Sequence, residues 1–196
     1  DVGNCMSFLL EACIGRKRAV LTHVEELASM MAAICHDVGH PGVNNNYLTT
    51  VRHTLAVRYN DKSILESFHA ATMFELMKKS TTYDYMANFS AEDQVKTRNL
   101  IVRLILDTDM SKHFDFVGNF KVRLEGLEAD AKNQKISQQL LDVNKADCRL
   151  EIMRLCIKAS DLGHASKPWD SHLFWSKRVV REFFAQGIKE KKQGII

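Results

Sequence analysis

The chain has few of the residues that interrupt helices, with 2 prolines and 9 glycines among 196 residues. It has no run of roughly 18 apolar residues that could cross a bilayer, and its first residues lack the apolar segment of a signal peptide. Neither sign of charge dominates, since 27 lysines and arginines are balanced by 24 aspartates and glutamates. We therefore expect no membrane contact and no nucleic-acid-binding surface in this segment.

Cysteine is also sparse, and the five cysteines show no Cys-x-x-Cys spacing. An odd, scattered set argues against a disulfide framework and against a cysteine-rich zinc site. This pattern favours a reducing compartment. We expect an intracellular domain that faces the cytoplasm, and any membrane association of a longer protein would lie outside this segment.

What the chain does have is helical spacing of its apolar residues. Hydrophobic residues make up 45% of the sequence, enough for one sizeable buried core. Steps of three and four recur from Val24 to Val38, whereas no segment has the alternation of a strand long enough to build a sheet. No internal repeat or linker divides the chain. The sequence predicts a single all-α domain over residues 1–196.

Several helix starts carry capping signals. Thr22 with Glu25 has the spacing of a capping box, and Ser63 with Glu66 repeats it ahead of an apolar run to Met77. Ser90 is the expected cap of a third helix through Leu106. Each of these residues predicts where a helix begins.

The second half of the chain is predicted from polarity and periodicity. The polar stretch at residues 128–139 reads as a loop after an apolar stripe at Val117, Phe120, Leu124 and Leu127. Two further helices are expected at about 145–160 and 171–186.

Nitrogen and oxygen donors are concentrated in the run His36-Asp37-Val38-Gly39-His40-Pro41-Gly42. On a helix that Pro41 and Gly42 terminate, His36 and His40 would share one face. A third carboxylate, Asp161, follows an apolar helix, where it must be paired, metal-bound or exposed. One imidazole and two carboxylates suit a catalytic divalent metal that keeps a position for water. The sequence therefore predicts metal-assisted hydrolysis through His36, Asp37 and Asp161.

These motifs carry a family resemblance that spans essentially the whole chain. Their order and separations resemble the catalytic domain of the class I cyclic nucleotide phosphodiesterases, within the HD-domain metallohydrolases. The matching segments are residues 36–45, 59–66, 108–113, 159–162 with 167–169, and 182–187. The resemblance implies a compact, all-α, multi-helix bundle and allows a homodimer through the catalytic domain.

The resemblance also implies two metals and a nucleotide pocket. Zn²⁺ would be held by His36, Asp37 and Asp161, with Asp37 also touching Mg²⁺ or Mn²⁺. The residues expected to support the second metal through its waters are His40, Glu66 and Thr108, and His69 falls where the family has a charge-network histidine. The residues that would line or border the nucleotide pocket are Met110, Leu162, His164, Trp175, Ser176 and Val179.

The implied reaction is hydrolysis of cyclic AMP, cyclic GMP or both to the 5′-monophosphate, by a hydroxide that bridges the two metals. The family's general-acid histidine and a further zinc-binding histidine would precede Asp1, and its purine-binding glutamine would follow Ile196. We therefore expect a partial catalytic domain with no general acid of its own. Two alternatives stay open, another HD-type phosphohydrolase and a non-catalytic nucleotide-binding pseudoenzyme. The residues do not discriminate between the two cyclic nucleotides.

Overall fold

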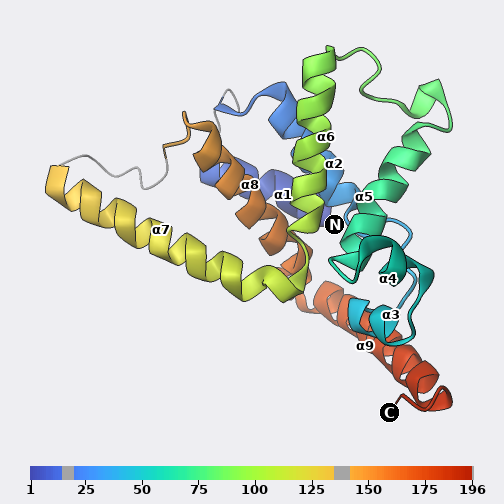
Figure 1. Cartoon of the computed structure of the whole chain (residues 1–196). Coiled ribbons are helices and arrows are strands. Elements are labelled where there is room, and N and C mark those ends of the chain that lie inside the picture. Colours follow the sequence, from blue (N-terminus) through green and yellow to red (C-terminus); the bar gives the residue numbers. More distant parts are fainter. Residues whose placement is uncertain (15–19, 135–141, 196) are drawn as a thin grey trace.

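A computed structural model describes residues 1–14, 20–134 and 142–195, and every regular element within those ranges is helical (Figure 1). This confirms the predicted all-α class. The α-helices are α1 Val2–Ile14, α2 His23–Cys35, α3 Asn45–Thr50, α4 Thr54–Tyr59, α5 Ile64–Met77, α6 Ala91–Leu106, α7 His113–Gln134, α8 Ala146–Asp161 and α9 Trp169–Lys192. Three short 3₁₀ turns join them, η2 Thr81–Tyr83, η3 Met110–Lys112 and η4 Gly163–Ser166.

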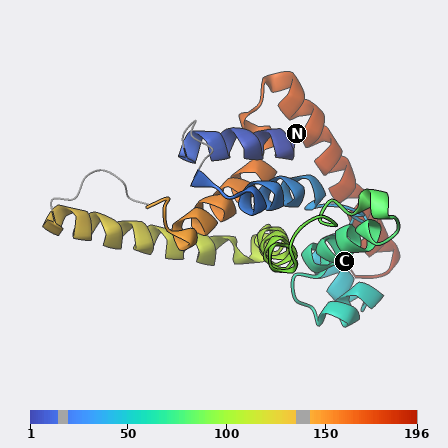
Figure 2. The same ribbon diagram turned by 90° about the horizontal axis from the view of Figure 1, so that it is seen from above.

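The main hydrophobic core lies where α1, α2, α6 and α8 pack together, with α5 at one side (Figures 1 and 2). Small side chains on α2, among them Ala28 and Ala32, are fully buried and let the neighbouring helices approach closely. Large side chains such as Ile101 on α6 and Met153 on α8 fill the space between them. Burial of this apolar surface is the main favourable contribution to folding.

Two helices extend beyond this core. α7 runs outward from the end of α6, and α9 runs from η4 along α3 to the C-terminal end (Figures 1 and 2). Polar contacts attach α9 to the loop before α3, since Gln186 Oε1 accepts a hydrogen bond from the Asn44 amide at 2.8 Å. Tyr47 also donates to Gln193 Oε1 at 3.0 Å. Within the described residues, no helix combines the length and apolar content needed to cross a bilayer.

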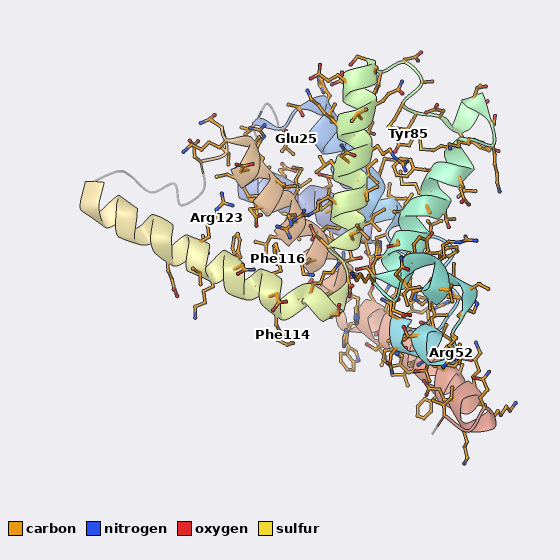
Figure 3. All side chains as sticks on the ribbon, in the orientation of Figure 1. Glu25, Arg52, Tyr85, Phe114, Phe116 and Arg123 are labelled. Atoms are coloured by element: carbon orange, nitrogen blue, oxygen red, sulfur yellow. The ribbon has the colours of Figure 1, made fainter. Side chains whose placement is uncertain are left out.

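Two of the three predicted caps are confirmed. Thr22 and Glu25 form the full capping box, with each side chain bonded to the other residue's backbone amide. Ser90 Oγ accepts from the Asp93 amide at 3.1 Å. Glu25 also pairs with Arg149 of α8 at 3.0 Å, so the start of α2 is tied to a second helix (Figure 3 labels Glu25).

The capping box predicted at Ser63 is wrong. Ser63 precedes α5 but has a φ of 43° and makes no side-chain cap. Its hydroxyl instead donates to the buried carboxylate of Asp109 at 2.7 Å, and Glu66 accepts from Asn45 rather than from the Ser63 amide. A buried carboxylate needs a donor, and Asn45 Oδ1 accepts a hydrogen bond from the Leu65 amide at this helix start, so tertiary contacts replace the local box.

The loop predicted at 128–139 is wrong for its first half. α7 continues to Gln134, because the segment is rich in Glu, Ala, Lys and Gln, which favour helix despite their polarity. Residues 135–139 lie outside the described ranges. The helix predicted at 145–160 agrees with α8, whereas α9 is longer than the predicted 171–186 at both ends.

We expect Thr22→Ala to lower the free energy of unfolding by about 1 kcal/mol, because the substitution removes the side-chain cap of α2. Thr22→Ser keeps the hydroxyl and is the matched control. Urea unfolding of both variants measures the effect. A Thr22→Ala variant as stable as Thr22→Ser would show that the capping box contributes nothing.

Candidate metal centre

The chain leaves helix geometry earlier than the sequence predicted. α2 ends at Cys35, and residues 36–39 form a turn in which Gly39 has a φ of 75°. That left-handed conformation suits glycine and changes the chain direction before Pro41. His36 and His40 therefore do not share a helix face, and that expectation is wrong.

The turn brings His36 and Asp37 together with Asp161, the last residue of α8. His36 Nε2 lies 3.3 Å from Asp37 Oδ2 and 3.2 Å from Asp161 Oδ1. One donor atom from each of the three residues lies within 4.8 Å of the other two, so the group could hold a metal ion. Residues more than 120 positions apart thus meet as the sequence predicted, although the ligand assignment itself stays a prediction.

The hydrogen bonds of His36 fit a metal ligand. Its Nδ1 lies 3.0 Å from the Ala33 carbonyl oxygen, which accepts the Nδ1 proton and leaves Nε2 directed at the two carboxylates. Burial lowers the pKa of His36, but hydrogen bonds to Asp161 and Asp37 outweigh burial and raise this pKa to about 10. Without an ion, Nε2 therefore keeps a proton between the carboxylates. A divalent cation would satisfy the same three donors and displace that proton.

Two further histidines adjoin Asp37. The buried ring of His69 donates from Nδ1 to the Val38 carbonyl at 2.8 Å, and its Nε2 lies 3.7 Å from Asp37 Oδ1. Burial lowers the pKa of His69, which favours a neutral ring. His40 stacks on His69 with 5.6 Å between ring centroids, and its Nδ1 accepts from the Gly42 amide. The two oxygens of Asp37 thus face two different imidazoles.

Glu66 and Thr108 make their hydrogen bonds away from His36, Asp37 and Asp161. Glu66 accepts from Asn45 Nδ2 at 3.0 Å, and burial raises the pKa of its carboxyl. Thr108 is buried and donates to the Ile105 carbonyl at 2.7 Å. No hydrogen bond or ion pair links either described side chain to His36, Asp37 or Asp161. Any contribution to a metal would therefore pass through ordered water.

The three donors lie in the wall of a cleft of about 630 Å³, within the usual size of small-molecule sites. Four of the six residues predicted to border the nucleotide line it, namely Leu162, His164, Trp175 and Val179. Met110 and Ser176 do not line this cleft. Met110 lies on η3 and is half exposed, and Ser176 Oγ is 3.5 Å from His172 Nε2.

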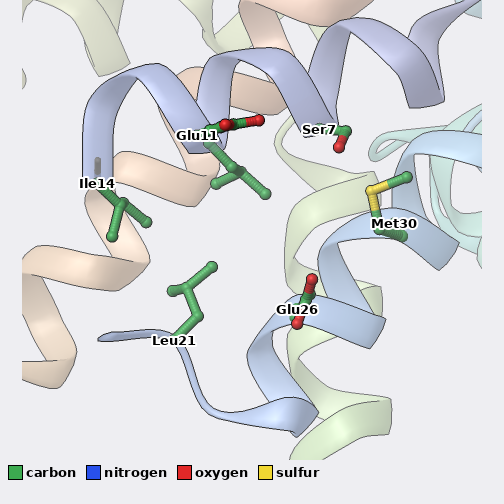
Figure 4. Close-up of a pocket in the computed structure, with 7 residues that line it drawn as sticks. Ser7, Glu11, Ile14, Leu21, Glu26 and Met30 are labelled. Atoms are coloured by element: carbon green, nitrogen blue, oxygen red, sulfur yellow. The ribbon is translucent and has the colours of Figure 1, made fainter. Parts of the chain in front are cut away.

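The cleft also contains residues that the sequence analysis missed. Arg178 and Glu182 lie on the same wall as Trp175 and Val179. These four positions have the i, i+3, i+4, i+7 spacing of one helix face, so the periodicity of α9 could have identified them. A second cavity, between α1 and α2, has about 30 Å³, room for roughly one water molecule and too little for a nucleotide (Figure 4).

Comparison with known proteins places these observations in a family. A family model described as 3′5′-cyclic nucleotide phosphodiesterase matches residues 1–196. A dual cyclic-AMP and cyclic-GMP phosphodiesterase beta of Plasmodium falciparum is 33% identical over 92% of this chain. A probable cyclic-AMP phosphodiesterase of Caenorhabditis elegans is 32% identical over the whole chain.

A solved structure gives the same fold. The phosphodiesterase domain of the RhoPDE fusion protein from the choanoflagellate Salpingoeca rosetta matches 98% of this chain with a TM-score of 0.79 and 28% identity. The chain covers 56% of that solved chain, 15% of the Plasmodium protein and 28% of the Caenorhabditis protein. The match over all 196 residues shows that this chain belongs to the 3′,5′-cyclic nucleotide phosphodiesterase family.

Proposed function

We propose that the protein containing this chain hydrolyses a 3′,5′-cyclic nucleotide to the 5′-monophosphate at the cleft described above. The observation that carries the proposal is the convergence of His36, Asp37 and Asp161 in the wall of that cleft. Cyclic nucleotides are the substrates named for the relatives, and a nucleotide fits a cleft of about 630 Å³.

In this proposal, His36, Asp37 and Asp161 hold Zn²⁺, for which one imidazole nitrogen and two carboxylate oxygens are suitable protein ligands. Asp37 would also help to hold Mg²⁺ or Mn²⁺. When bound, the two ions would supply the positive charge that polarises the phosphate and activates water. The Ala33 carbonyl keeps the His36 ring oriented, so that Nε2 stays directed at the zinc position.

The second ion is assigned to residues that act through water. Mg²⁺ loses its water ligands reluctantly, and polar groups near the site can hold those waters by hydrogen bonds. Glu66, Thr108 and His40 would have this role in the proposal, and His69 lies beside Asp37, with its Nε2 3.7 Å from Oδ1. Leu162, Trp175 and Val179 give the cleft apolar wall surface against which a base could pack.

The experiment is an assay of the purified full-length gene product with cyclic AMP and cyclic GMP in separate reactions. We expect the 5′-monophosphate of at least one nucleotide and none of the 3′-monophosphate. Linear phosphate esters serve as comparison substrates. Hydrolysis of linear esters alone would favour another HD-type phosphohydrolase, and nucleotide binding without hydrolysis by the metal-loaded protein would favour the pseudoenzyme.

A further inference from the structure

A buried lysine connects α8, which ends at Asp161, to the turn after α6 that contains Thr108. Lys158 on α8 is 6% exposed, and its Nζ donates to the main-chain carbonyl of Asp107 at 2.6 Å. Asp107 is the residue directly after α6, and its backbone amide caps the end of that helix. The lysine therefore holds the peptide group that immediately precedes Thr108.

The side chain of Asp107 is also held by α8. Arg154, one turn before Lys158 on α8, donates to the Asp107 carboxylate from Nε at 2.6 Å and from Nη2 at 3.0 Å. Such two-point pairing fixes geometry as well as charge. The Phe116 ring of α7 covers both cations, 4.7 Å from the Arg154 guanidinium and 5.6 Å from Lys158 Nζ (Figure 3 labels Phe116).

The consequence is a direct link between the segments that contain Thr108 and Asp161. Thr108 follows Asp107 directly, and Asp161 follows Lys158 by one helical turn. Movement of α8 along α6 would have to break the contacts of Lys158 and Arg154 with Asp107. The contacts at Asp107 thus keep the two residues in register.

Stability alone does not account for a lysine at this position. Burial of an ammonium group is costly, and a well-packed apolar side chain of similar volume is often as stabilising as a buried ion pair or more so. Burial lowers the pKa of Lys158, while the carboxylates of Asp107, Asp161 and Asp109 oppose that effect. What the ammonium group adds over an apolar residue is a directed bond to the Asp107 carbonyl.

We propose that Lys158 is a positioning residue for the second metal. It keeps Thr108, which would hold waters of that metal in the proposed function, in register with the donors at Asp161. This inference rests on the proposed function, because the two metal positions are defined there. Lys158 itself would contact neither metal nor substrate. Loss of Lys158 should therefore weaken binding of the second metal and leave the zinc position occupied.

The test is a titration of the zinc-loaded full-length protein with Mn²⁺, followed by electron paramagnetic resonance of the free ion. Lys158→Met removes the ammonium group and keeps a long unbranched side chain. Lys158→Arg keeps a donor for the Asp107 carbonyl. Lys96→Met is the matched control, because Lys96 lies on α6 in an exposed pair with Glu92 far from this contact.

We expect Lys158→Met to weaken Mn²⁺ binding about tenfold and Lys158→Arg about threefold, as is usual for residues that support metal ligands indirectly. Zinc content should stay equal in all variants, and Lys96→Met should bind Mn²⁺ like the unmodified protein. Unchanged Mn²⁺ affinity in Lys158→Met would overturn the proposal. If Lys158→Met does not fold, unchanged Mn²⁺ affinity in Lys158→Arg would overturn the proposal.

Hydrolysis measured on the same preparations keeps the two proposals apart. An unmodified protein that binds Mn²⁺ and responds to Lys158→Met, yet cleaves no cyclic nucleotide, would contradict the proposed function and leave the role of Lys158 standing. An active protein whose Mn²⁺ affinity is unchanged by Lys158→Met would contradict the role of Lys158 and leave the proposed function standing.

Discussion

Asp37→Ala is expected to lower kcat/KM for cyclic nucleotide hydrolysis by more than about 10³-fold, a loss of about 4 kcal/mol in transition-state stabilisation. The reason is the position of the carboxylate between two groups. Its Oδ2 lies 3.3 Å from His36 Nε2 and its Oδ1 lies 3.7 Å from His69 Nε2, and in the proposal Asp37 would help to hold both ions. Its side chain is 63% exposed and lies in the wall of the cleft. Steady-state kinetics at saturating Zn²⁺ and Mg²⁺ measure the loss.

Glu66→Gln is the matched comparison for Asp37→Ala. Glu66 acts through water in this proposal, so its substitution should weaken Mg²⁺ binding by about 10- to 100-fold. Added Mg²⁺ should recover most of the activity. Circular dichroism verifies that both variants fold. Equal, metal-insensitive losses in the two variants would argue against a bridging role for Asp37.

Removal of bound metal should have a comparably large effect. We expect dialysis against a strong chelator to reduce hydrolysis by more than about 10³-fold, because the ions supply the charge that the chain's own residues cannot. His36 Nε2 would take up a proton in place of the ion, consistent with the raised pKa of this residue. The unfolding temperature should fall as well, because the metal binds the folded state.

Reactivation of the metal-free protein by added metals identifies the two ions. Zn²⁺ followed by Mg²⁺ should restore activity, whereas Mg²⁺ alone should not, because an imidazole nitrogen is a poor ligand for Mg²⁺. Undiminished hydrolysis by protein verified to be free of metal would contradict the proposed chemistry.

The sequence predicts the helices well where local interactions decide their ends. The Thr22 and Ser90 caps and the extent of α8 depend on residues within one or two turns, and all three agree with the structure. The sequence fails where distant residues compete. Ser63 gives its hydroxyl to Asp109, which lies 46 positions away, and no local pattern reveals that contact.

The candidate metal centre was predictable in its donors and less so in its walls. His36, Asp37 and Asp161 could be chosen by chemistry, whereas the geometry that joins them depends on the Gly39 turn at the end of α2. The cleft wall depends on the rotation of α9, which places Arg178 at the cleft and leaves Ser176 beside His172. The homodimer and the intracellular location stay predictions.

Anomalous diffraction at the zinc absorption edge, from crystals of the active full-length protein, tests the metal centre most directly. We expect one strong peak about 2.0–2.2 Å from His36 Nε2 and from one oxygen each of Asp37 and Asp161. His36→Ala should abolish the peak together with hydrolysis. Crystals of fully active protein with no transition metal between these three side chains would contradict the proposal that zinc at this site drives the reaction.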